Sequence, residues 1–307
     1  MDRSKQKRLW IITLIGVLYF SGVAMVLYPM FGNIYSMSTS RTEIKDYKVA
    51  VEKMDNTEIL QRFERADEYN RSLAEGNINK ALSVALNGKE NIMCYVEIPS
   101  LSIYLPVYYG TSDEVLKKGC GWLENTSLPV GGINTHSVIS GHTGLPNAEM
   151  FTKLDNIKKD DVFYIYVYDR VLAYKVVTID TVTPEHTELL TIVPDKDYLT
   201  LLTCTPYGIN DRRLLVKGER VVTSPQEKEE EASPQHSGVS APDEADRELT
   251  AQIRHEFLYI MLITAAAVVV FTAACIWLSI TVRRRSSGKY ACDNKRLEED
   301  NAEEKEE

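Results

Sequence analysis

Two long runs of apolar residues stand out from the otherwise mixed pattern of this chain. Residues 9–32 and 257–282 contain no charged side chain, and each run exceeds the roughly 20 residues that a helix needs to cross a bilayer. We therefore predict two transmembrane helices. Lysine and arginine flank the runs on their outer sides, in residues 1–8 and 283–307. Because cytoplasmic flanks are enriched in cations, both termini are predicted to be cytoplasmic and residues 33–256 extracytoplasmic.

A cleaved signal peptide is the alternative interpretation of the first run, since a charged segment precedes it. The run is long for a signal peptide, and no convincing small-x-small cleavage site follows it. We therefore expect the first run to be retained as a membrane anchor.

The chain between the two runs divides into three parts by pattern. In residues 33–90 apolar side chains recur every three or four positions, which predicts helices; Asp55 and Glu58 resemble a capping box there. Residues 91–222 hold short aromatic and β-branched segments between turn residues, which favours a closed β-barrel over a sandwich or a parallel α/β sheet. Residues 223–256 are polar and contain proline, which predicts a disordered linker. The expected strands are 93–98, 103–108, 137–140, 162–168, 172–182, 198–204 and 214–222.

The net charge of −9 is concentrated outside the predicted barrel. Residues 222–250 hold eight acidic and two basic side chains, and residues 286–307 hold eight acidic and four basic ones. The remainder is close to neutral and has no basic face. The composition therefore gives no support for a nucleic acid partner, and the acidic end of the chain is expected to be solvated.

One cysteine of the outer region has the position of a nucleophile. Cys94, Cys120 and Cys204 all lie between the predicted spans, and an odd number of thiols cannot all pair. Cys94 and Cys120 suit buried apolar positions. Cys204 closes an apolar strand and precedes the turn sequence Thr-Pro-Tyr-Gly, so a rigid strand would hold its thiol at the edge of an open loop. Thiol attack at neutral pH also requires a nearby base or cation.

Two arginines are candidates for that cation. Arg212 and Arg213 follow the turn and begin the next predicted strand. If the two strands form a hairpin, one arginine returns beside Cys204, and alternation sends the other to the opposite face of the sheet. A guanidinium that stays protonated can stabilise a thiolate and later an oxyanion. The alternative is that both arginines are ordinary surface charges.

His142 is the candidate base. It lies in Ser140-Gly-His-Thr-Gly, just past the predicted strand 137–140, and imidazole transfers protons near neutral pH. A histidine in such a loop is more often structural than catalytic when it is considered alone. A zinc site formed by His136, His142 and Cys204 is conceivable from the ligand types, but no paired metal-ligand spacing supports it.

Three stretches are informative when they are taken together. They are Thr200-Leu-Leu-Thr-Cys-Thr-Pro-Tyr-Gly-Ile-Asn-Asp-Arg-Arg-Leu-Leu-Val, Val138-Ile-Ser-Gly-His-Thr-Gly-Leu-Pro, and Tyr109-Gly-Thr-Ser-Asp-Glu-Val-Leu with Thr126-Ser-Leu-Pro-Val-Gly-Gly. They closely resemble the pilus-assembling, class C sortases over residues 93–222. The resemblance implies a mainly β fold, a sortase-like closed eight-stranded β-barrel with N-terminal helices, flanked by two transmembrane helices.

The resemblance also implies a reaction and its residues. Cys204 corresponds to the nucleophile, His142 to the general acid/base, and Arg213 to the residue that stabilises the oxyanion. Such enzymes are cysteine transpeptidases that cleave an LPxTG-like sorting signal of a pilin or surface protein through a thioacyl-enzyme. The class C acceptor is usually a lysine of another pilin. We expect no cofactor and no metal, and the resemblance implies a catalytic domain outside the membrane of a Gram-positive cell.

Two departures from the family pattern are visible. Residues 33–92 lack the Asp-Pro-aromatic tripeptide that forms a lid over the groove in most pilus sortases, so lid gating is not expected. Where relatives tend to have Gly-x-Gly-His-Leu-Glu, this chain has Gly119-Cys-Gly-Trp-Leu-Glu, which makes Cys120 an extra thiol without an evident role.

Other functions remain open at this point. A sortase that attaches proteins to the peptidoglycan precursor shares the chemistry. A non-catalytic, membrane-tethered peptide-binding module would be expected to lack one of Cys204, His142 and Arg213, and all three are present. A papain-like protease places its cysteine before its histidine, which is the reverse of the order found here.

Overall fold

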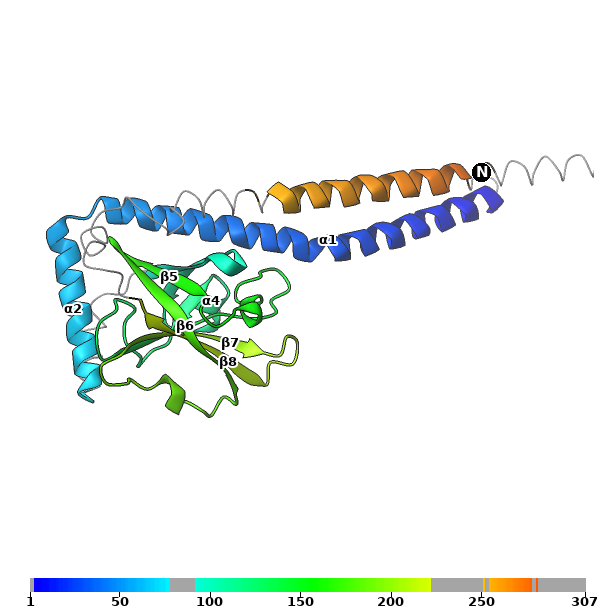
Figure 1. Cartoon of the computed structure of the whole chain (residues 1–307). Helices are drawn as coiled ribbons and strands as arrows, with labels where there is room; N and C mark the ends of the chain where they lie inside the picture. The colour runs from blue at the N-terminus through cyan, green and yellow to red at the C-terminus, as the bar shows by residue number, and fades with distance from the viewer. Residues whose placement is uncertain (1–2, 78–91, 222–250, 252–253, 278–279, 281–307) are drawn as a thin grey trace, which may run out of the picture. The chain divides into compact units, whose positions relative to one another are not determined.

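The computed structural model describes residues 3–77, 92–221, 251, 254–277 and 280 (Figure 1). The chain divides into two compact units: residues 1–28 with 256–307, and residues 29–255. Most of the predicted linker 223–256 and the whole predicted tail 283–307 lie outside the described residues.

The first unit contains most of the first predicted span and all of the second. Trp10–Glu52 and Arg254–Trp277 are helices long and apolar enough to cross a membrane. Within this unit Tyr19 donates a hydrogen bond to the carbonyl of Ala267 at 2.9 Å, and its ring stacks on Phe271. The C-terminal helix includes Arg254, so it begins slightly before the predicted position. The cytoplasmic location of both termini stays a prediction.

Helix α1, Arg3–Glu52, is continuous where the sequence predicted a span followed by a separate helix. Pro29 lies inside the helix without ending it. The C-terminal part of α1 packs on the outside of the barrel through Ile44 and Tyr47, which are buried against three tyrosines. The Tyr47 hydroxyl also donates to the carbonyl of Met93 at 3.1 Å. Those tyrosines are Tyr95, Tyr104 and Tyr166.

Helix α2, Asn56–Ala74, contributes its apolar face to the barrel core. The core residues from this helix include Phe63 and Tyr69, and the Tyr69 hydroxyl donates to the carbonyl of Thr126 at 3.1 Å. Asp55 occupies the predicted N-cap position, but its side chain makes no capping hydrogen bond. The capping-box prediction is therefore correct for the helix start and wrong for the side-chain interaction.

Eight strands close into a barrel in the order β1-β2-β3-β4-β7-β8-β6-β5, which confirms the predicted fold class (Figure 1). The pairs β2–β3 and β4–β7 are parallel, and the other adjacent pairs are antiparallel. The strands are β1 Cys94–Ile98, β2 Ile103–Tyr109, β3 Cys120–Trp122, β4 Thr135–Ser140, β5 Val162–Val167, β6 Arg170–Val182, β7 Asp197–Thr205 and β8 Arg212–Arg220. Short helices at Pro99–Leu101 (η2), Asp113–Leu116 (α4), Leu154–Asn156 (η3) and Glu188–Leu190 (η4) lie in the connections.

Alternation along the strands separates the barrel interior from its outer face. On β7 the side chains of Leu199 and Leu201 belong to the main apolar core, as do Leu214 and Val216 on β8 and Ile139 on β4. Successive strand residues point to opposite faces. Cys204 on β7 and Arg213 on β8 alternate with these core positions and therefore face outward.

Candidate active site

Cys204 lies near the end of β7, half-buried, on the outer face of the barrel. Its cross-strand partner on β8 is Arg213. Residues that lie opposite each other in an antiparallel pair point to the same face, so both side chains project outward from adjacent strands. The hairpin predicted from the sequence is present, and Arg213 rather than Arg212 lies beside the thiol.

The two arginines lie on opposite faces of the sheet, as the alternation of side chains along a strand requires. Arg212 lies opposite Thr205, on the other face from Arg213, and it is exposed where Arg213 is half-buried. The Arg213 guanidinium donates through Nη1 to two backbone carbonyls of the β7–β8 loop region, of Asn210 at 3.3 Å and of Arg212 at 3.0 Å. These bonds hold the cation near the strand end that carries Cys204.

His142 leaves the sheet at the level of Cys204. β4 runs parallel to β7, with Ser140 beside Leu202, and the N–H of Gly141 donates to the carbonyl of Leu202 at 3.0 Å. Continuing that register places residue 142 next to residue 204. Adjacent strands are about 5 Å apart, so the chain at His142 enters its loop beside the end of β7 that carries Cys204, with Arg213 on the other side of that strand.

Two threonines fix the loop of His142 against β7. The Thr203 hydroxyl donates to the carbonyl of Gly141 at 2.7 Å, and its oxygen lies 2.6 Å from the Thr143 hydroxyl oxygen. Because a carbonyl can only accept, the Thr203 proton is committed to Gly141 and Thr143 is the donor of the second bond. The carbonyl of His142 accepts from the N–H of Phe151 at 3.0 Å. The loop is thus fastened on both sides of His142.

His136 does not lie where a zinc site shared with His142 and Cys204 would need it. It is fully buried, its Nδ1 lies 2.8 Å from the carbonyl of Thr191, and its Nε2 lies 2.7 Å from the Thr200 hydroxyl. Burial lowers the pKa of His136 to about 4. The ring is therefore neutral at neutral pH, with its proton on Nδ1, and both nitrogens are already hydrogen-bonded. In the described part of the chain no three His, Cys, Asp or Glu residues are grouped as for a metal ion.

The other two outer cysteines are core residues, as their pattern suggested. Cys94 and Cys120 are completely buried on the interior face, where each lies opposite Val107 of β2. Burial raises the pKa of both thiols. Neither thiol is open to a substrate, which leaves Cys204 as the accessible thiol among the described residues of the barrel.

Comparison with known proteins assigns this arrangement to a family. The family model described as the sortase domain matches residues 96–221. The X-ray structure of Clostridium perfringens sortase C with its C-terminal cell wall sorting motif is 47% identical, covering 59% of this chain and 99% of that chain with a TM-score of 0.56. The chain belongs to the class C sortases.

Further relatives agree with this assignment. Streptococcus pneumoniae sortase C is 44% identical, covering 60% of this sortase and 99% of that chain with a TM-score of 0.54. Sortase A of Streptococcus agalactiae serotype III is 32% identical over 120 residues, 38% of this sortase, which spans 48% of that relative. Sortases are cysteine transpeptidases, so the accessible thiol of this sortase matches the chemistry of its family.

Sequence reasoning missed the residues that support the site. Nothing in the sequence marks Thr203 and Thr143 as supporting residues, apart from their positions next to Cys204 and His142. Their hydrogen bond depends on the parallel pairing of β4 with β7, which joins segments far apart in the sequence. The buried position of His136 was likewise not foreseen. Part of the region in which a lid was considered, residues 78–91, lies outside the described residues.

Proposed function

We propose that this sortase joins pilin subunits by transpeptidation, with Cys204 as nucleophile, His142 as general acid/base and Arg213 as oxyanion stabiliser. The observation that carries the proposal is the pairing of Cys204 with Arg213 across β7 and β8, together with the hydrogen bond from Gly141 to Leu202 that brings the loop of His142 to the same end of β7. The cognate signal is an LPxTG-like sequence, and the catalytic domain works outside the membrane.

In the first half-reaction the Cys204 thiolate attacks the carbonyl carbon of the signal's threonine. The guanidinium of Arg213 stabilises the oxyanion of the tetrahedral intermediate, and it remains protonated throughout. When the intermediate collapses, the Thr–Gly C–N bond breaks and His142 protonates the departing amine. A thioester between the enzyme and the donor protein remains.

In the second half-reaction a lysine amine of another pilin attacks the thioester. His142 accepts the proton that the amine loses, the C–S bond breaks, and Cys204 leaves as a thiolate that is ready for the next cycle. The new bond is an isopeptide between two subunits. The Streptococcus pneumoniae sortase C was described in terms of its pilin substrate specificity. This similarity supports a pilin as the substrate of the present chain.

The test is polymerisation of a purified pilin that carries both the sorting signal and a lysine acceptor, catalysed by the full chain in lipid nanodiscs. We expect covalent ladders on denaturing gels with the natural enzyme. Cys204→Ala should abolish them, whereas Cys94→Ala and Cys120→Ala should retain them because those thiols are sealed in the core. Thermal unfolding of each variant checks that it is folded.

Ladders formed by Cys204→Ala would reject the mechanism. Transfer of the pilin to a peptidoglycan precursor, without ladders, would reject pilin polymerisation and support the cell-wall anchoring function instead. Mass spectrometry of the enzyme incubated with a signal peptide alone should detect the thioester on Cys204, and its absence from a folded enzyme would also count against the proposal.

A further inference from the structure

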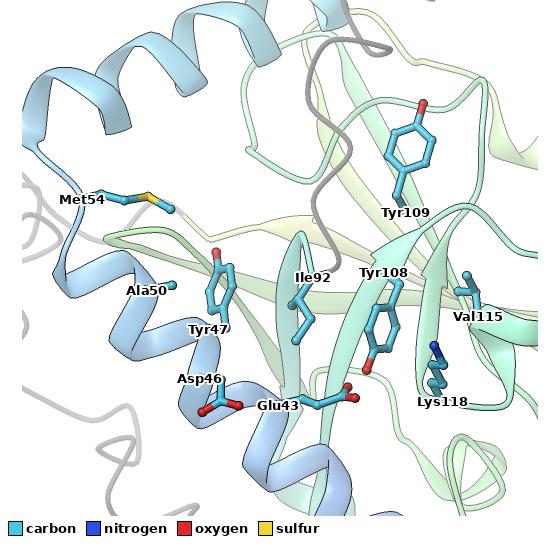
Figure 2. A pocket seen from close by; sticks show the side chains of 10 residues that line it. All are labelled: Glu43, Asp46, Tyr47, Ala50, Met54, Ile92, Tyr108, Tyr109, Val115 and Lys118. Carbon is cyan, nitrogen blue, oxygen red and sulfur yellow. The ribbon is translucent and has the colours of Figure 1, made fainter.

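A pocket lies outside the barrel, away from the candidate active site, between α1 and the outer side of β2 and α4 (Figure 2). Its volume is about 670 Å³, which is within the usual range for small-molecule and side-chain binding sites. It is lined by Glu43, Asp46, Tyr47, Ala50, Met54, Ile92, Tyr108, Tyr109, Val115 and Lys118.

Two polar atoms in this pocket have no hydrogen-bond partner within the described part of the chain. They are the hydroxyl of Tyr108, a residue only 7% exposed, and Oε2 of Glu43. Figure 2 shows both groups turned toward the same part of the pocket. A buried polar atom that lacks a partner destabilises a protein by about 1–3 kcal/mol. Such atoms therefore point to a ligand that satisfies them.

The charges around these atoms favour a cation. Two carboxylates, of Glu43 and Asp46, and one ammonium, of Lys118, line the pocket, and Glu43 interacts electrostatically with both other groups. Burial raises the pKa of Glu43, and Asp46 adds to the rise while Lys118 opposes it. A ligand with several N–H donors and a positive charge would match the carboxylates and the Tyr108 hydroxyl together, as a primary ammonium with three donors does.

The pocket changes from polar to apolar along helix α1. Glu43 and Asp46 lie at one end, Ala50 follows one turn later on the helix, and Met54 lies in the turn just beyond the end of α1 (Figure 2). Ile92 and the aromatic rings of Tyr47 and Tyr109 complete the apolar part. An alkyl chain ending in an ammonium fits this gradient, because its methylene groups bury apolar surface while its charged end reaches the carboxylates.

The register places this pocket well away from Cys204. Tyr108 pairs with Gly121, Gly121 with Ser140, and Ser140 with Leu202, so three strand spacings of about 5 Å separate Tyr108 from β7. A side chain held in the pocket is therefore not the amine that attacks the thioester.

We propose that this pocket is a docking site for a lysine side chain of a protein substrate, distinct from the lysine that reacts. The identity of that substrate rests on the proposed function, whereas the affinity of the pocket for a lysine side chain does not. Holding a second lysine fixes the orientation of the bound subunit, which leaves its reactive amine free at Cys204.

The test is ligand-observed saturation-transfer NMR on the full chain in lipid nanodiscs. The probe is Nα-acetyl-lysine methylamide, and the matched control probe is Nα-acetyl-norleucine methylamide, which keeps the alkyl chain without the ammonium. We expect saturable binding of the lysine probe and about tenfold weaker binding of the norleucine probe. The lysine probe should bind equally well to Cys204→Ala.

Three variants assign the binding to this pocket. Glu43→Gln and Tyr108→Phe should each weaken binding of the lysine probe by about fivefold or more, and Lys118→Met should strengthen it because a like charge is removed. The control is Glu52→Gln, an exposed position on the same helix that does not line the pocket. Thermal unfolding confirms that each variant is folded.

The inference is overturned if the two probes bind equally, if Glu43→Gln leaves binding unchanged, or if Lys118→Met weakens binding. The last result would indicate an anion site.

In polymerisation, Glu43→Gln should raise the KM for the pilin without changing thioester hydrolysis. Probe binding without any transpeptidation would reject the proposed function alone. Transpeptidation without probe binding would reject the docking site alone.

Discussion

At the scale of single residues, cross-strand pairing decides which of the two adjacent arginines can act on the Cys204 thiol. Arg212 and Arg213 have the same chemistry and adjacent positions, yet β-strand alternation gives them different faces. The pairing of Cys204 with Arg213, and of Thr205 with Arg212, makes the two arginines matched controls for one another.

We predict that Arg213→Ala lowers the rate of thioester formation by about 10², the size of effect seen when an oxyanion donor is removed. Arg212→Ala should retain most of the activity, because its side chain points away from Cys204. The measurement is kcat and KM for cleavage of a signal peptide by the full chain in nanodiscs.

Equal losses in the two arginine variants would contradict an oxyanion role for Arg213 and would indicate a general effect of positive charge. Arg213→Lys adds a second comparison. It keeps the charge but loses the planar guanidinium and its two backbone hydrogen bonds, so its activity should lie between those of the natural enzyme and Arg213→Ala.

At the scale of structural elements, His136 connects the β6–β7 loop to the sheet that carries the site. Its two ring nitrogens join the carbonyl of Thr191 in this loop to Thr200 on β7. Because burial lowers the pKa of His136 to about 4, this connection requires the neutral ring and is sensitive to acid.

The sign of the effect follows from proton binding. Between about pH 6.5, the ordinary value for histidine, and the folded value, the unfolded chain binds the proton that the folded chain excludes. Stability therefore falls as the pH drops through this window. We predict that His136 accounts for about 2 kcal/mol of the stability that the enzyme loses between pH 7.5 and pH 5, measured by equilibrium urea unfolding.

His136→Gln tests this prediction by comparison of slopes. The variant is expected to be less stable at every pH, but its free energy of unfolding should fall less between pH 7.5 and pH 5. An unchanged slope in His136→Gln would mean that the histidine ionises freely in the folded protein.

The elements that could be predicted from the sequence are those with local signals. Strands with four or more alternating residues were found to within two residues at most boundaries, and the β7–β8 hairpin followed from one turn sequence. β3 was missed because Cys120–Trp122 is too short to show alternation. The continuity of α1 through Pro29 was also missed, because proline usually interrupts a helix interior.

The three residues of the candidate site could be predicted from the sequence to different degrees. The spacing of Cys204 and Arg213 across a turn is local, so residue patterns suggested their pairing. The position of His142 depends on the parallel β4–β7 pair, which joins distant segments, so its assignment rested on family resemblance. The α1 pocket has no sequence signal, because it arises from a helix and strands that meet only in the folded chain.

At the scale of the whole molecule, helix α1 contacts the loop that follows His142. The N–H of Glu149 donates to Oδ1 of Asn33 at 3.1 Å, and a side chain added at Gly32 would overlap Asn147. The same helix contains the first predicted span. The part of α1 that follows the predicted span therefore supports a loop of the candidate site.

We predict that Gly32→Leu lowers transpeptidation by about tenfold, because the loop at Asn147 must shift and it is fastened to the His142 carbonyl through Phe151. Gly22→Leu is the matched control, since nothing lies within 4 Å of a side chain added there. Turnover by the full chain in nanodiscs, with thermal unfolding as a check, provides the measurement. Equal activity of the two variants would show that the α1 contact does not support the site.

The parallel pairing of β4 with β7 also has a consequence for the order in which the enzyme matures. β7 and β8 are consecutive, so Cys204 and Arg213 meet by closing a short loop, whereas the Thr143–Thr203 hydrogen bond joins residues 60 apart in the chain. Long-range pairing of this kind forms slowly, because more chain entropy is lost before any contact is gained. We therefore expect the Cys204–Arg213 pair to form before the loop of His142 is fixed against β7.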